Sequence, residues 1–260
     1  MSQSENHGRF VWHELMTSDP TAAEHFYRDV VGWDAKPVEG GNHSYTTWIA
    51  NGAPIGGMME TPAGANAPPS WTGYIEVDDA DATVNRAKEL GASVIMGPHT
   101  APGVGRFAIL TDPQGAVFAV IKSETSPTPE TDPKPLEFSW HEYMANDWKA
   151  ANEFYSALFG WKKQSEMEMS PMGTYYMFGR DRFTYGGMMN RPANMPAQPH
   201  WLHYVSVRDS ADAAADRATK GGATVINGPM EVPGGDRIAA MIDPQGAGFA
   251  VHSKPASPKS

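Results

Sequence analysis

The chain has 260 residues, a net charge of −10 and no cysteine. The absence of cysteine excludes disulfides, thiolate metal sites and cysteine nucleophiles, and the acidic balance argues against a nucleic-acid partner because phosphate binding needs a basic surface. No apolar run approaches the roughly 18 residues of a membrane span, and no secretory signal opens the chain, so we expect a cytoplasmic protein without a membrane partner.

The first half of the sequence alternates strands with helices. The stretch RFVWHELMT is typical of a strand, and DPTAAEHFYRDVVG predicts a helix with Asp19 as its N-cap, Pro20 in its first turn and Gly32 at its end. A second helix is expected in ADATVNRAKELG. Further strands are expected at residues 43–50, 55–60, 71–79, 93–97, 105–112 and 116–122. This order predicts an α+β fold with a mixed, largely antiparallel sheet.

The second half of the sequence repeats the first. FVWHELMTSDPTAAEHFYRDVVGW, from Phe10, matches FSWHEYMANDWKAANEFYSALFGW, from Phe138, at an offset of 128 residues. IGGMM matches YGGMM at an offset of 130, and TDPQGAVFAV matches IDPQGAGFAV at an offset of 131. The acidic, proline-rich segment 123–136 between the halves is typical of an extended linker. The sequence therefore predicts two similar domains, at residues 8–122 and 137–254.

The order of these elements, with FYRDVVGW after the first strand and DPQGAVFAV in the last hairpin, resembles the glyoxalase/bleomycin-resistance/ring-cleaving dioxygenase (vicinal oxygen chelate) superfamily. The tandem form is similar to the branch of lactoylglutathione-lyase-related proteins and proteins named as hydroxylases. The resemblance implies two βαβββ modules per domain, whose curled sheet encloses a cup. Single-copy relatives dimerise to complete their cups, so we expect this tandem chain to be a monomer with an internal pseudo-dimer, or a homodimer.

The two HE pairs look like metal ligands, but strand geometry separates their members. Successive side chains of a strand point to opposite faces. His13 shares its face with the aliphatic Val11 and Leu15, which we place against the helices. That assigns His13 and His141 structural roles and leaves the alternate residues in the cups, namely Trp12, Glu14, Trp140 and Glu142.

The resemblance also implies where a metal would bind. In metal-binding members, His and Glu ligands stand on the first, middle and last strands, and the matching positions here are Trp12, Trp140, Thr72, Leu202, Ala119 and Ala250. None carries a metal-ligand side chain, and such a site needs about three. We therefore expect no metal and no other cofactor. The alternative is a shifted site for Zn, Ni, Fe or Mn, in which a bulge turns His203 inward beside Glu14 or Glu142.

The expected cups combine aromatic, sulfur-containing and acidic side chains. A flat or apolar small molecule would stack on tryptophan, and a glutamate would grip its polar end. The methionines of the GGMM strands also suit ordinary core packing. The expected ligand-binding residues are Trp12, Tyr74, Met58, Trp140, Tyr204, Met188 and His203.

Two classes of function stay open from the sequence. The first is a binding protein of bleomycin-resistance type, without the usual metal, that takes a hydrophobic or cationic small molecule. The second is a lyase, isomerase or oxygenase of lactoylglutathione-lyase type acting on a small carbonyl compound. In that enzyme Glu14 or Glu142 would be the catalytic base, because a desolvated carboxylate can remove a proton α to a carbonyl. A shared fold does not decide between these classes.

Overall fold

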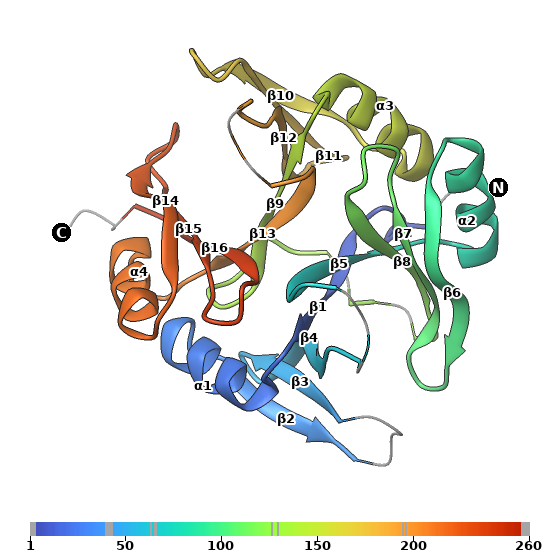
Figure 1. Ribbon diagram of the computed structural model, residues 1–260. Helices are drawn as coiled ribbons and strands as arrows, with labels where there is room; N and C mark the ends of the chain where they lie inside the picture. Colours follow the sequence, from blue (N-terminus) through green and yellow to red (C-terminus); the bar gives the residue numbers. More distant parts are fainter. Residues whose placement is uncertain are drawn as a thin grey trace. The chain divides into compact units, whose positions relative to one another are not determined.

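The computed structural model describes residues 4–39, 44–62, 64, 67–125, 127–128, 130–193, 195 and 197–255. The expected strand start at His43 and the linker residues Ser126 and Pro129 lie outside this part of the chain. Figure 1 shows the course of the chain through its strands and helices. Each half of the sequence forms two βαβββ modules, as the resemblance predicts.

The first half contains β1 (Phe10–Thr17), α1 (Pro20–Val30), β2 (Asp34–Val38), β3 (Tyr45–Ala50), β4 (Ala53–Glu60), β5 (Ser70–Glu76), α2 (Ala80–Glu89), β6 (Ser93–Ala101), β7 (Gly105–Thr111) and β8 (Val117–Ser123). The second half contains β9 (Phe138–Ala145), α3 (Trp148–Phe159), β10 (Lys162–Glu168), β11 (Thr174–Arg180), β12 (Phe183–Asn190), β13 (His200–Ser206), α4 (Ala211–Lys220), β14 (Thr224–Glu231), β15 (Arg237–Ile242) and β16 (Gly248–Ser253).

Each half contributes one mixed eight-stranded sheet. The strand orders are β2-β3-β4-β1-β5-β8-β7-β6 and β10-β11-β12-β9-β13-β16-β15-β14. Within each module the first and last strands pair parallel, as β1 does with β4 and β5 with β8, and the other pairs are antiparallel. This arrangement confirms the predicted α+β fold of two tandem domains.

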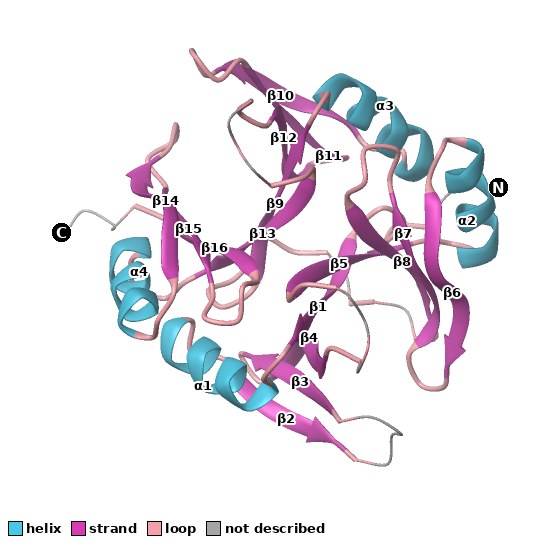
Figure 2. Ribbon diagram, in the orientation of Figure 1, coloured by secondary structure: helices cyan, strands magenta, loops and turns pink. Residues whose placement is uncertain are grey.

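The compact units of the chain do not coincide with the two halves of the sequence. One unit takes Met1–Trp12, Thr72–Asp132 and Trp140–Trp201, and the other takes His13–Trp71, Pro133–Ser139 and Leu202–Ser260. Helices α2 and α3 are in contact in the first unit, as α1 and α4 are in the second; Figure 2 shows the four helices against the strands. Each unit therefore combines one module from each half.

Local sequence explains the start of α1. The Asp19 carboxylate accepts a 2.9 Å hydrogen bond from the Ala22 backbone N–H, and Pro20 occupies the first turn. Both features satisfy the unpaired N–H groups of a helix start. In α3, Asp147 is the N-cap and Gly160 ends the helix with φ +71°. No helix in the described residues is long and apolar enough to cross a membrane.

A buried hydrogen-bond chain joins α1 to the DPQG turn of the second half. The Trp71 indole N–H donates to the Tyr27 hydroxyl at 2.8 Å, and that hydroxyl donates to the Asp243 carboxylate at 3.0 Å. Burial and the neighbouring carboxylate raise the pKa of Tyr27 well above its usual value, so the hydroxyl keeps its proton and donates. The other Asp243 oxygen accepts from backbone N–H groups of its own turn, including that of Gln245 at 2.9 Å.

The other unit contains the reciprocal connection. Tyr155 of α3 donates to Asp112 in the DPQG turn of the first half at 2.9 Å, and it accepts from the Trp201 indole at 3.0 Å. Here the carboxylate also accepts from Tyr143 at 2.5 Å, where the first half has Leu15. The tyrosine of each FY motif thus contacts the aspartate of the DPQG turn in the other half. The two motifs that carry the family resemblance therefore meet in buried contacts.

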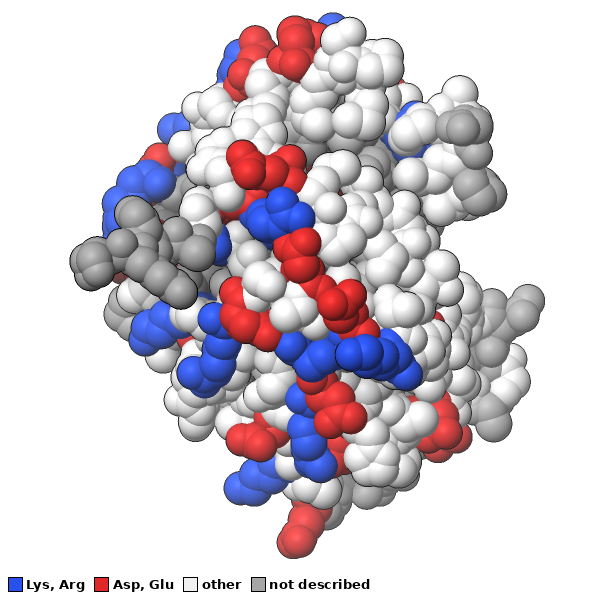
Figure 3. Space-filling view, turned by 90° about the vertical axis from the view of Figure 1, so that its left-hand side faces the viewer, with Lys and Arg blue, Asp and Glu red and all other residues white. Residues whose placement is uncertain are grey.

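Charged side chains of both signs are mixed on the face shown in Figure 3, and no broad basic patch covers its described residues. Arg217 of α4 pairs with Asp209, just before the helix, and Arg237 of β15 pairs with Asp212 in the first turn of α4. Such exposed pairs contribute little to stability. The expected lack of a nucleic-acid partner stays a prediction.

Candidate functional site

Strand register separates the two faces of each sheet. Leu15 pairs with Met58, and both lie in the hydrophobic core that contains α1 and α4 residues. Glu14 pairs with Gly57 and therefore belongs to the opposite face. We call this side the glutamate face; it carries Glu14, Gly57 and Tyr45 in the first half and Glu142, Gly187 and Tyr175 in the second.

On the glutamate face of the first half, a tyrosine meets the glutamate. The Tyr45 hydroxyl donates a 3.0 Å hydrogen bond to the Glu14 carboxylate, and both side chains are half-buried. The end of the tyrosine ring lies above Gly57, where any Cβ would collide with the hydroxyl. The second glycine of the GG step therefore makes room for the tyrosine. The first glycine, Gly56, has another role, because a Cβ there would collide with the His13 carbonyl of the neighbouring strand.

The second half repeats this arrangement. Tyr175 donates to Glu142 at 2.9 Å, and the Trp140 indole N–H donates to the Tyr175 hydroxyl at 2.8 Å. Glu142 is 8% exposed and Tyr175 is 9% exposed, so this carboxylate is buried. Gly187 again lies under the tyrosine ring. Charge-assisted hydrogen bonds of this kind are about twice as strong as neutral ones.

The other expected ligand-binding residues divide between two environments. Trp12 and Tyr74 lie in a small apolar cluster with Ala119 and Ile121. Tyr204 is buried on β13, where it pairs with Ala250.

Met58 and Met188 instead fill the helix-packed cores, because they share the faces of Leu15 and Tyr143. We expected these two methionines in the cups because the sequence alone does not give the register of β4 and β12. Ligand binding by the remaining residues stays a prediction.

The metal positions implied by the resemblance carry no ligand groups in the structure. Ala119 and Ala250 are fully buried on the last strands, and Trp140 uses its only polar atom to reach Tyr175. An alanine methyl has no lone pair, so the superfamily's usual His and Glu set does not fit this chain.

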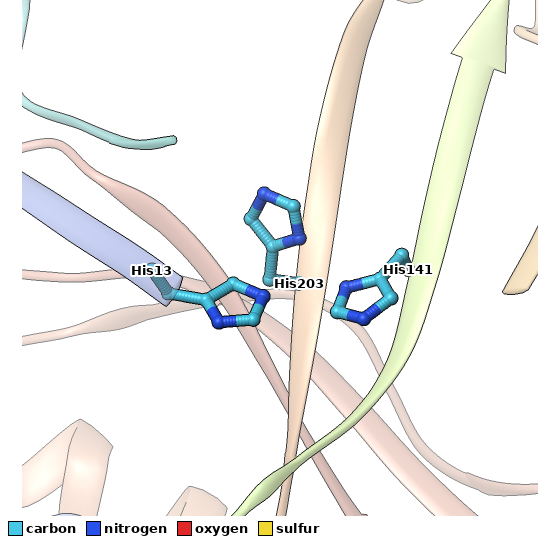
Figure 4. A group of neighbouring side chains, drawn as sticks. All are labelled: His13, His141 and His203. Carbon is cyan, nitrogen blue, oxygen red and sulfur yellow. The ribbon is translucent and has the colours of Figure 1, made fainter. Parts of the chain in front are cut away.

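Three buried histidines nevertheless come together elsewhere. The ligand atoms of His13, His141 and His203 all lie within 4.8 Å of one another, and Figure 4 shows their rings approaching from β1, β9 and β13. His13 stacks on Phe138 with ring centroids 3.7 Å apart, and it meets His203 edge-on at 4.9 Å. His141 stacks on Phe10 at 3.8 Å.

The chemistry of this group suits a divalent metal. Burial lowers the pKa of His203 to about 3, so its ring is neutral near pH 7, as a metal-binding imidazole must be. Three imidazoles are a known zinc set, although bound nitrogens lie only about 3.4 Å apart, so the rings would have to draw together.

The structure therefore does not support the expected absence of a metal site. Alternation assigned His13 and His141 to the helix side. His203 lies two residues before Val205 on β13, and Val205 belongs to the hydrophobic core packed against the helices. His203 therefore lies on the same side of the strand as that core, and not on the glutamate face, where it was expected. The sequence could not show that the three rings meet.

Comparison with known proteins agrees with this fold. The model of the Glyoxalase/Bleomycin resistance protein/Dioxygenase superfamily matches residues 9–120 and 138–251. The chain belongs to this superfamily.

Among its relatives is the Mycobacterium tuberculosis protein named "Putative glyoxylase CFP32", 35% identical over 245 residues that cover 92% of each chain. Another is "Anthracycline biosynthesis protein DauV" of Streptomyces sp. (strain C5), 31% identical over 268 residues that cover 94% of this chain and 92% of the relative.

Two solved structures show the same fold at low sequence identity. The Mn(II)-bound glyoxalase from Novosphingobium aromaticivorans has a TM-score of 0.63 and 16% identity, covering 98% of this chain and 84% of its own. Homoprotocatechuate 2,3-dioxygenase from Arthrobacter globiformis has a TM-score of 0.69 and 13% identity, covering 96% of this chain and 80% of its own.

Proposed function

We propose that the protein binds a small organic molecule on the glutamate face, where the tyrosine–glutamate pair holds its polar end. One observation carries the proposal: the hydrogen bond from tyrosine to glutamate over a glycine occurs in both halves, with Tyr45 and Glu14 in one and Tyr175 and Glu142 in the other. Fold stability alone does not require a half-buried carboxylate on a sheet, because removing a carboxylate from water is unfavourable.

The chemistry of the pair defines the ligand. A carboxylate accepts hydrogen bonds, so the bound group carries an O–H, an N–H or a positive charge. The tyrosine ring beside each glutamate is flat and largely apolar, which favours a planar ring system. The relative named for anthracycline biosynthesis supports this class, because anthracyclines are planar ring systems with hydroxyl and carbonyl groups.

A second candidate is an enzyme, as the name of the glyoxylase relative suggests. A glutamate on this face would remove a proton α to a carbonyl, and the neighbouring tyrosine would hold the substrate oxygen. The oligomeric state and the compartment of the protein stay predictions.

Tryptophan fluorescence titration tests the proposal with a panel of hydroxylated planar aromatics, including an anthracycline. We expect the double variant Glu14→Gln/Glu142→Gln to bind at least tenfold more weakly, since a hydrogen bond to a charged group contributes about 1.5–3 kcal/mol. Glu60→Gln, at the exposed end of β4, is the control. Equal affinity of the wild type and the double variant would contradict the proposal, and turnover of a carbonyl compound that is lost in the double variant would favour the enzyme.

A further inference from the structure

We infer that Ser139, His252 and Asp236 form a hydrolytic site, in which the Ser139 hydroxyl takes an acyl group from a small ester. The inference goes beyond the proposed function and does not depend on it, because none of the three residues belongs to the tyrosine–glutamate pairs. All three lie in the same compact unit of the chain.

The first argument is a hydrogen-bond chain through the three side chains. His252 Nε2 lies 2.8 Å from an Asp236 carboxylate oxygen, and His252 Nδ1 lies 3.1 Å from the Ser139 Oγ. The carboxylate accepts from Nε2–H, so the neutral ring presents the lone pair of Nδ1 to the serine hydroxyl. The Tyr204 carbonyl oxygen is 3.5 Å from the same hydroxyl, so the imidazole is the closer acceptor. A serine in contact with a base that a carboxylate orients is the arrangement that activates a hydroxyl nucleophile.

The second argument is the way the sheet brings these residues together. Strand β13 lies between β9, which carries Ser139, and β16, which carries His252. Val251 belongs to the hydrophobic core, so the next residue, His252, points to the opposite side of the sheet. Its partner on β13 is the small Ser206, across which the imidazole reaches β9. Asp236 directly precedes β15, the strand that pairs with β16 on its other side.

The third argument is access to the serine. The side chains of His252 and Asp236 are 16% and 35% exposed, and Ser139 is half-buried. A small ester can therefore reach the hydroxyl. The partial burial also strengthens the hydrogen bonds of the chain relative to those of a fully solvated group.

The fourth argument comes from the matching positions of the first half. The offsets of 128 and 131 residues that relate the two halves match the three polar residues to Val11, Ile121 and Gly105. Val11 and Ile121 pack in one small apolar cluster. The same strands therefore fold with apolar residues at these positions, so the fold does not require a serine, a histidine and an aspartate there.

The reaction is an acyl transfer in two steps. The Ser139 oxygen bonds to the carbonyl carbon of the ester while its proton passes to His252 Nδ1. The bond from that carbon to the alcohol oxygen breaks, and this oxygen leaves with the proton from His252. Water then attacks the acyl carbon with His252 again as the base, and it releases the carboxylic acid and the free serine.

A fluorophosphonate probe and p-nitrophenyl acetate test the inference on the full chain. With the probe, the serine oxygen bonds to phosphorus, fluoride leaves and the hydroxyl proton passes to His252. We expect peptide mass spectrometry of the wild type to find the phosphonate on Ser139. We expect Ser139→Ala to remove this label and to slow ester hydrolysis about a hundredfold, and His252→Gln to slow labelling to a similar extent. Ser165→Ala, at an exposed serine of β10, and His25→Gln, at an exposed histidine of α1, are the controls.

Asp236 acts through His252, so it is a positioning residue and needs a separate readout. We expect Asp236→Asn to slow labelling and to shift its pH profile, because an amide does not favour a protonated imidazole as a carboxylate does. A residue that only held the turn before β15 would lower the rate without shifting the profile, and that result would remove Asp236 from the site.

Mapping the label on the wild-type protein does not depend on whether any variant folds. A wild type without label on Ser139, or with label on other residues alone, would overturn the inference. Equal labelling rates in the wild type and in folded His252→Gln would also overturn it. None of these results bears on ligand binding at the glutamate face, which the titration of the glutamate variants tests separately.

Discussion

The Tyr27 hydroxyl, on a helix of the first half, donates a 3.0 Å hydrogen bond to the Asp243 carboxylate, in a turn of the second half. The reciprocal bond joins Tyr155 to Asp112. In both contacts, the tyrosine of the FY motif in one half binds the aspartate of the DPQG turn in the other half. Each contact therefore needs residues from both halves.

The exchange predicts unequal effects of two matched substitutions. Asp112 accepts from both Tyr143 and Tyr155, whereas Asp243 accepts one tyrosine hydroxyl in the described residues. Tyr27→Phe should therefore lower the free energy of unfolding by about 2 kcal/mol, and Tyr155→Phe by less, because Asp112 keeps a partner. Urea denaturation measures both. A larger loss in Tyr155→Phe would refute this explanation.

The buried Glu76 predicts a pH effect on stability. Burial raises the pKa of Glu76, against the opposing effects of hydrogen bonds from Ser123 and of the nearby Lys122. A carboxyl whose pKa is higher in the folded state destabilises the fold once the pH exceeds its unfolded value, and it has no effect below that value. Glu76→Gln should therefore be more stable than the wild type at pH 8, with the difference shrinking toward pH 4. A difference that stays constant with pH would argue against ionisation as the cause.

Two glycines with positive φ predict a stability difference that depends on their surroundings. Gly8 has φ +84° and a Cβ there would lie 2.9 Å from the Phe159 carbonyl oxygen, whereas Gly52 has φ +80° with nothing within 4 Å. Gly52→Ala should cost about 1 kcal/mol from the backbone alone. Gly8→Ala should cost clearly more, measured by thermal or urea unfolding. An equal loss of stability in Gly8→Ala and Gly52→Ala would mean that the Phe159 carbonyl can move aside without a free-energy cost.

Gly57→Ala should weaken ligand binding although it replaces neither Tyr45 nor Glu14. A Cβ at Gly57 would collide with the Tyr45 hydroxyl and displace it from Glu14. We expect a Kd at least tenfold above that of the wild type. Tyr45→Phe, which keeps the ring, isolates the contribution of the hydroxyl. An unchanged Kd for Gly57→Ala would show that the position of the tyrosine does not matter for binding.

The three histidines predict uptake of a divalent metal. Their ligand atoms lie within 4.8 Å of one another, and zinc or cobalt added to chelator-treated protein should bind at one equivalent per chain. His203→Leu should abolish this uptake, and His25→Leu, exposed on α1, is the control. Elemental analysis after dialysis measures the content. Uptake that is absent, or that persists in His203→Leu, would assign the histidines a packing role.

Local sequence patterns predict where a helix begins and which of its residues are buried, but they do not predict which distant residues contact one another. Asp19 and Pro20 mark the start of α1 because capping is decided within a few residues. Periodicity shows that Tyr27 is buried, but it does not show that Asp243 is its partner, since that contact joins residues 216 positions apart.

The site shows the same division. Strand alternation separated Glu14 from His13 correctly, because it needs only the residue order. Tyr45 was not predicted as a site residue because no motif surrounds it. The sequence feature that could have identified it is the matching tyrosine, Tyr175, at an offset of 130 residues. Met58 was assigned to the cup because its face depends on pairing with Leu15, which the order of residues does not give.

The most direct test of the central claim is a crystal structure of the protein with the panel ligand that binds most tightly. We expect a polar group of that ligand at hydrogen-bond distance from the carboxylate of Glu14 or Glu142, with Tyr45 or Tyr175 beside it. A ligand bound away from both glutamate faces, for example among the three histidines or in the cleft of about 540 Å³ that α1 and α4 line, would contradict it.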